Sequence, residues 1–74
     1  MITRNCRLNY PPSLLREPII SQLIQRFDLT ANILQAHISL EEGWLEIELI
    51  GEPHTLKVAL LWLEDSGIEV VDLA

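Results

Sequence analysis

The fold follows from residues 44–50, which read WLEIELI. Side chains alternate between two faces along this stretch, as they do in a β-strand with one face buried. One face carries Leu45, Ile47 and Leu49, and the other carries Trp44, Glu46, Glu48 and Ile50. Residues 41–43, EEG, form a short loop in which the glycine suits a hairpin. We therefore expect the strand to pair with an earlier one over residues 31–40.

The segments on either side of this hairpin follow one order of elements. Before it, an alternating strand over residues 3–10 ends at two prolines, and an amphipathic helix follows from Pro18 to Phe27. After it, a helix over residues 53–65 leads to a strand over residues 68–73. The order β-α-β-β-α-β predicts a ferredoxin-like α+β sandwich, with both helices on one face of a four-stranded antiparallel sheet. We expect a single domain over residues 1–74.

Composition narrows the class of protein. Five basic against eleven acidic residues give a net charge of −6, which argues against nucleic acid and anionic membrane surfaces as partners. No apolar run approaches the roughly 20 residues of a membrane-spanning helix, and no signal peptide is apparent, so we expect a cytoplasmic protein. Cys6 is the single cysteine, which excludes an internal disulfide and an iron–sulfur cluster held by its own thiolates. We expect a buried thiol and no cofactor.

The sheet face away from the helices carries the candidate interface. Strand alternation places four apolar side chains there: Ile33, Trp44, Ile50 and Val71. Isolated exposed apolar residues are ordinary, but a tryptophan among β-branched residues on an open sheet favours a contact surface. We therefore expect a homodimer or a larger homo-oligomer.

The polar candidates for catalysis or metal binding have simpler explanations. Glu46 and Glu48 form a carboxylate pair on one strand face, but Arg7 on the neighbouring strand is placed to pair with them. His37 and His54 lie on different elements with no second ligand at a metal-binding spacing. We expect neither an enzyme nor a metal site.

Three segments carry a resemblance to a known family. Residues 17–23 (EPIISQL), 26–27 (RF) and 31–38 (ANILQAHI) resemble the NIL domain family, which is named for its Asn-Ile-Leu tripeptide. The resemblance implies a ferredoxin-like domain found at the C-terminus of the ATP-binding subunit of methionine-importing ABC transporters. There it pairs with its copy and binds methionine, so the resemblance implies ligand contacts at Asn32, Ile33 and Leu34.

Two functions remain open on this basis. The first is a small non-catalytic regulatory module that self-associates and senses methionine or a related amino acid. The alternative is a protein-interaction adaptor that docks on a transporter or redox partner without binding a small molecule. Asn32 does not decide between them, because an asparagine at the start of a strand also satisfies local backbone groups.

Overall fold

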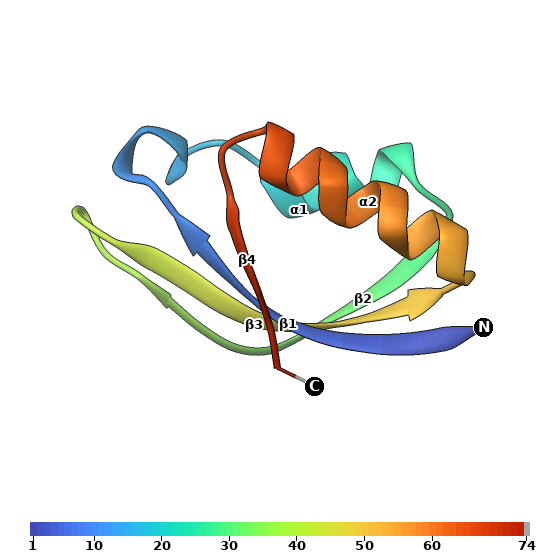
Figure 1. Cartoon of the computed structure of the whole chain (residues 1–74). Helices are drawn as coiled ribbons and strands as arrows, with labels where there is room; N and C mark the ends of the chain where they lie inside the picture. Colours follow the sequence, from blue (N-terminus) through green and yellow to red (C-terminus); the bar gives the residue numbers. More distant parts are fainter. Residues whose placement is uncertain (74) are drawn as a thin grey trace.

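A computed structural model gives the structure of this protein and describes residues 1–73 (Figure 1). Four strands alternate with two α-helices and one short 3₁₀ turn. The elements are β1 (Ile2–Tyr10), η1 (Pro12–Leu14), α1 (Ile19–Arg26), β2 (Leu29–Ile38), β3 (Gly43–Gly51), α2 (Pro53–Asp65) and β4 (Glu69–Asp72).

The strands form one antiparallel sheet in the order β2-β3-β1-β4. Both helices cover the same face of this sheet and leave the other face open (Figure 1). The predicted ferredoxin-like sandwich is confirmed. Because β1 and β3 are central, β2 and β4 are the two edges of the sheet. No helix within residues 1–73 is long and apolar enough to cross a membrane.

Alternation in β1 and β3 builds the core as predicted. Every second residue of β3 is buried, and the buried side chains of β1 and the helices meet them. The fully buried large side chains are Cys6, Leu8, Leu23, Ile47, Leu49, Leu56 and Leu63. The register of β4, which the sequence left ambiguous, is now clear. Val70 lies opposite the buried Leu8, and Val71 lies opposite Arg7 on the open face.

A glycine ends α2, and a serine forms the turn of the hairpin between β2 and β3. Gly67 has φ +103°, the left-handed conformation expected after α2. The hairpin turns at Ser39, whose hydroxyl accepts hydrogen bonds from the backbone N–H groups of Glu41 and Glu42 at 3.3 and 3.1 Å. This turn removes Ser39 and Leu40 from the ladder, so β2 ends at Ile38 and not at residue 40. The strand also starts earlier, at Leu29, because Phe27 is already extended (φ −126°, ψ 143°).

The structure corrects the predicted face of Ile33. A bulge between Ile33 and Gln35 interrupts the pairing of β2 with β3. Ile33 lies opposite the buried Ile47, so its side chain is on the helix-covered face of the sheet and not on the open face. Gln35 lies opposite Glu46 on the open face, where simple alternation also placed it. Alternation failed at Ile33 because the extra residue in the bulge reverses the phase of the strand.

Candidate functional site at the edge of the sheet

Edge strand β2 carries the most exposed large apolar side chains of the sheet. Ile33, Leu34 and Ile38 are 56%, 54% and 57% exposed, and Leu40 beyond the strand is 89% exposed. All residues of β2 from Asn32 onward are exposed, although Ile33 and Ile38 belong to the helix-covered face. The helix layer therefore stops short of this edge. We define Ile33, Leu34, Ile38 and Leu40 as the edge strip.

The three residues of the Asn-Ile-Leu tripeptide point in different directions. Asn32 lies opposite Glu48 on the open face, and Ile33 is on the helix-covered face. Leu34 is the unpaired residue of the bulge between Ile33 and Gln35. They do not converge on either face of the sheet. A ligand that contacts all three must lie along the outer edge of β2, where none of the strands within residues 1–73 pairs.

Asn32 is held in place by its neighbour on β3. Its Nδ2 donates a hydrogen bond to Oε1 of Glu48 at 3.2 Å. This leaves the second amide N–H and the carbonyl oxygen of Asn32 available, because a side-chain amide has two donors and one acceptor oxygen. Within residues 1–73, Glu48 makes no ion pair, whereas Glu46 faces Arg7. The pair therefore offers a donor for a carboxylate beside an acceptor for an ammonium group.

A groove continues the edge strip beyond Ile38. It has a volume of about 550 Å³ and lies between η1 with its following loop and the end of β2. Its lining consists of Pro12, Ser13, Leu15, Arg16, Ile38, Ser39 and Leu40. Leu15 packs closely on the hairpin, so a Cβ at residue 43 would require the end of the Leu15 side chain to shift. No motif in the sequence predicts this groove.

Trp44 on the open face is covered by its own chain. The guanidinium carbon of Arg7 lies 4.1 Å from the ring centroid of Trp44. The His37 ring stacks on the same indole at 6.2 Å with an interplanar angle of 24°. Since β3 lies between β1 and β2, Arg7 and His37 flank the indole from opposite sides. Trp44 and Ile50 are half-buried and Val71 is 40% exposed, all on the open face as predicted; their role as an interface stays a prediction.

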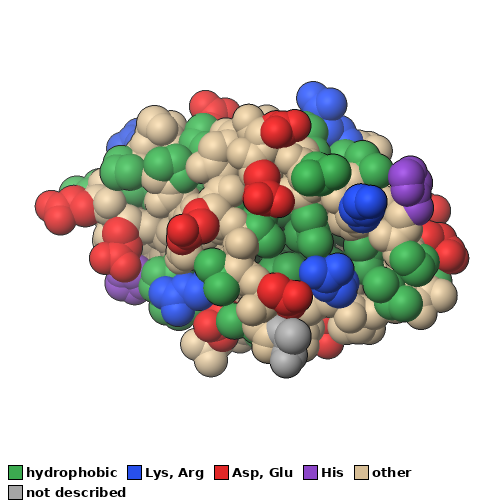
Figure 2. All heavy atoms as spheres, viewed as in Figure 1, with side chains coloured by type: hydrophobic (Ala, Val, Ile, Leu, Met, Phe, Trp, Pro, Cys, Tyr) green, Lys and Arg blue, Asp and Glu red, His purple; other side chains and the backbone are tan. Residues whose placement is uncertain are grey.

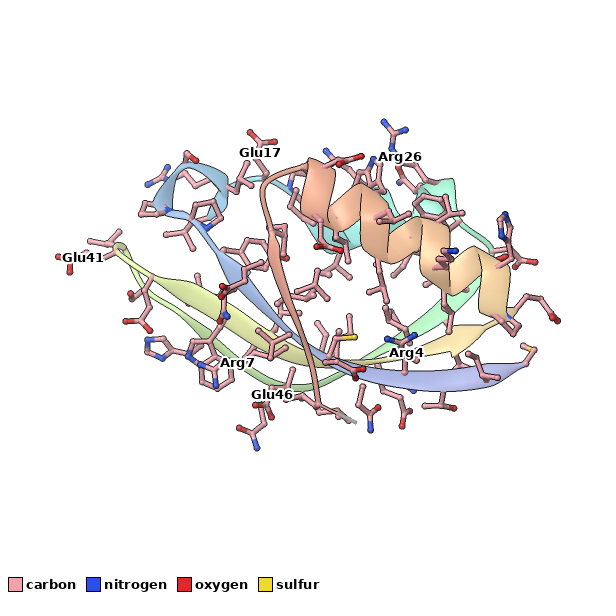
Figure 3. All side chains as sticks on the ribbon, in the orientation of Figure 1. Arg4, Arg7, Glu17, Arg26, Glu41 and Glu46 are labelled. Atoms are coloured by element: carbon pink, nitrogen blue, oxygen red, sulfur yellow. The ribbon has the colours of Figure 1, made fainter. Side chains whose placement is uncertain are left out.

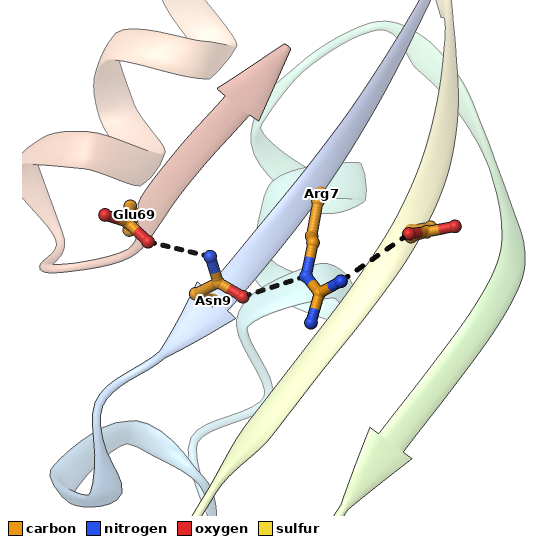
Figure 4. Close-up of polar contacts among 4 residues, drawn as sticks. Arg7, Asn9 and Glu69 are labelled. Carbon is orange, nitrogen blue, oxygen red and sulfur yellow. Dashed lines mark hydrogen bonds and ion pairs between the residues drawn. The ribbon is translucent and has the colours of Figure 1, made fainter. Parts of the chain in front are cut away.

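Of the two glutamates on this face of β3, Glu46 pairs with Arg7 as expected, whereas Glu48 accepts a hydrogen bond from Asn32 instead. Figure 3 shows Arg7 and Glu46 on the side of the sheet away from the helices, and their charged groups are 3.8 Å apart. Arg7 Nε also donates to Oδ1 of Asn9 at 3.2 Å, and Asn9 Nδ2 donates to Oε1 of Glu69 at 2.7 Å (Figure 4). This polar row links β3, β1 and β4. Glu46 is therefore a structural partner of Arg7, which accounts for it without an acid–base role.

Other titratable groups have structural positions. Cys6 is buried, and burial raises the pKa of its thiol, a shift that the nearby Arg4 opposes and Asp72 reinforces. His54 lies in the first turn of α2, on a different element from His37. Among residues 1–73, no group of three or more His, Cys, Asp or Glu side chains is arranged to hold a metal ion.

Comparison with known proteins relates nearly the whole chain to one family. The NIL domain model matches residues 4–71. An uncharacterized protein of Synechocystis is 35% identical over 66 residues, covering 86% of this chain and 68% of that protein. The methionine import ATP-binding protein MetN of Helicobacter hepaticus is 35% identical over 60 residues, which is 76% of this chain but 17% of that subunit.

A solved structure agrees with this relationship. The C-terminal domain of an ABC transporter ATP-binding protein from Enterococcus faecalis superposes with a TM-score of 0.84 at 25% sequence identity. The match covers 96% of this chain and 83% of that domain. The fold and the sequence therefore lead to the same relatives.

Proposed function

The chain belongs to the NIL domain family, and we propose that it is a non-catalytic regulatory module that self-associates and senses methionine or a related amino acid. The ligand would lie along the outer edge of β2, beside Asn32. The observation that carries this proposal is the position of Asn32 at the start of the edge strip, with the apolar side chains of Ile33 and Leu34 next to it.

The chemistry of this edge suits an amino acid with an apolar side chain. Asn32 and Glu48 are joined by a hydrogen bond of 3.2 Å, and beyond it they keep the second amide N–H of Asn32 and further acceptor positions on the Glu48 carboxylate, which complement the carboxylate and the ammonium of a zwitterion. The edge strip supplies an apolar surface, against which the flexible thioether of methionine packs well. Two of the relatives are named methionine import ATP-binding proteins, so methionine is the first ligand to test.

The test is a thermal melt of the purified protein with increasing L-methionine. At a concentration ten times the Kd, binding stabilises the folded state by about 1.4 kcal/mol. For a domain of this size, each kcal/mol raises the Tm by about 4–8 °C. D-methionine has the same side chain with the opposite arrangement of charged groups and should give a much smaller shift.

Two asparagine variants locate the site. Asn32→Ala should abolish the shift, because it removes the amide that faces the ligand. Asn5→Ala is the matched control, since Asn5 lies opposite Glu48 on the other neighbouring strand and is also exposed. That control should retain the shift. Unchanged melting of the unmodified protein at millimolar L-methionine would refute the ligand assignment.

A further inference from the structure

Arg16 is the arginine whose side chain has no partner within residues 1–73. The other arginines each have one: Arg4 forms an ion pair, Arg7 forms an ion pair and stacks on an indole, and Arg26 lies over the ring of Trp62. The side chain of Arg16 makes no hydrogen bond, ion pair or ring contact in this part of the chain, and the residue is exposed. Its guanidinium is therefore available to a ligand.

This free guanidinium belongs to the groove between η1 and the end of β2. The volume of the groove, about 550 Å³, lies within the range of small-molecule sites. Most of its lining is apolar. The ends of the Leu15 and Ile38 side chains would both touch a Cβ at Gly43, so apolar side chains from the two walls meet over the hairpin. The groove thus combines an apolar interior with one cation.

The polar groups of the groove suit an anion without an ammonium group. Arg16 is the single charged residue of the lining. The Ser39 hydroxyl is already used, because it accepts hydrogen bonds from two backbone N–H groups of the hairpin and donates one to the carbonyl oxygen of Glu42 at 3.1 Å. The Ser13 hydroxyl has no partner within residues 1–73. No carboxylate lines the groove that could balance an ammonium group.

The surroundings of the groove repel an anion less than the rest of the surface does. Figure 2 shows acidic side chains spread over the face that carries β4 and α2, whereas β2 is the opposite edge of the sheet. The sequence from Leu29 to Leu40 has no Asp, Glu, Lys or Arg. Glu17 and Glu41 do not line the groove, and Figure 3 shows both pointing away from the body of the molecule. In a chain with a net charge of −6, this is a favourable place for a negative ligand.

We infer that the groove binds a small organic acid, an apolar chain or ring with one carboxylate that the Arg16 guanidinium holds. The guanidinium presents parallel N–H donors that match a carboxylate, and the apolar lining covers the remainder of the ligand. This ligand class differs from the zwitterion proposed at Asn32. Ile38 lies roughly 20 Å along the strand from Asn32, so the groove is a second site and does not depend on the proposed function.

An NMR titration of the ¹⁵N-labelled protein with sodium hexanoate tests the site. Saturable shifts are expected for the backbone amide signals of Ser13 and Leu40 and for the Nε–H signal of Arg16. Butanoate should bind about tenfold more weakly, because each buried methylene strengthens binding by roughly fourfold. The uncharged 1-hexanol should also bind at least about tenfold more weakly, because it cannot form the charge-assisted pair.

Matched variants locate the anion. Arg16→Gln should weaken hexanoate binding by about tenfold or more. Arg26→Gln is the control, since Arg26 is also exposed but lies on α1, and it should retain the affinity. Asn32→Ala should retain it as well, because Asn32 belongs to the other site.

Three results would overturn the inference. They are an absence of shifts at Ser13 and Leu40 at saturating hexanoate, equal affinity of Arg16→Gln and the unmodified protein, and equal affinity for hexanoate and 1-hexanol. A failure of L-methionine to bind would affect the proposed function alone, because the two sites use different residues and different ligands.

Discussion

At the scale of single residues, Cys6 was predicted to be a buried thiol, and the structure confirms it. The sequence placed it on the apolar face of the first strand, and in the structure it is fully buried among the core side chains. Burial is the main cause of its raised pKa, so the thiolate is disfavoured in the folded state. The thiol is therefore a packing element and not a nucleophile at neutral pH.

The pH dependence of stability follows from this shift. The unfolded chain releases the Cys6 proton near the ordinary pKa of 9.0, while the folded chain holds it to higher pH. The folded state thus binds more protons above pH 9, and the free energy of unfolding should fall as the pH rises through that range. Denaturant melts between pH 7 and 10 should show this decline, and Cys6→Ala should flatten part of it. An equal slope in both proteins would contradict a raised thiol pKa.

At the scale of elements, the periodicity of apolar residues predicted β1, β3 and α2, because their apolar side chains recur at regular intervals on one buried face. Residues 44–50 read as a strand in the sequence and form the body of β3. The bulge in β2 was not predictable, because no glycine or proline marks it. It shifts the pairing register of β2 with β3, and that register depends on both strands. The groove beside Arg16 was also missed, since it arises from two segments that meet only in the fold. The absence of charge from Leu29 to Leu40 was the one visible signal of the edge.

Substitution of Trp44 distinguishes the two candidate contact surfaces, the open face of the sheet and the edge strip. It contacts Arg7 and His37 on the open face, away from the edge strip. Trp44→Ala should lower the free energy of unfolding by about 1–3 kcal/mol through lost packing and cation–π contacts. It should leave the solution mass unchanged at concentrations where the variant is folded. A folded monomer would instead support the open face as the interface, as the sequence first suggested.

At the scale of the whole molecule, covering the unpaired edge strand β2 would also add to the small buried surface of the domain. A chain of 74 residues buries a modest share of its surface alone, so it gains from a partner that covers its exposed apolar side chains. On the helix-covered face, Ile33 and Ile38 of β2 stay more than half exposed, and the other edge of the sheet is short and charged. A ligand or partner that covers this edge would therefore extend the helix-covered core beside Asn32.

Sedimentation equilibrium of two matched variants tests this account most directly. Leu34 and Leu61 are 54% and 52% exposed, but Leu34 lies in the edge strip and Leu61 on α2. Leu34→Asp places a carboxylate in the apolar edge strip and should weaken self-association through that strip by about a hundredfold or more. Leu61→Asp should leave the protein at twice its chain mass of 8.5 kDa, as for the unmodified protein. An unmodified protein that sediments at 8.5 kDa at every concentration, or equal dimerisation of both variants, would contradict the account.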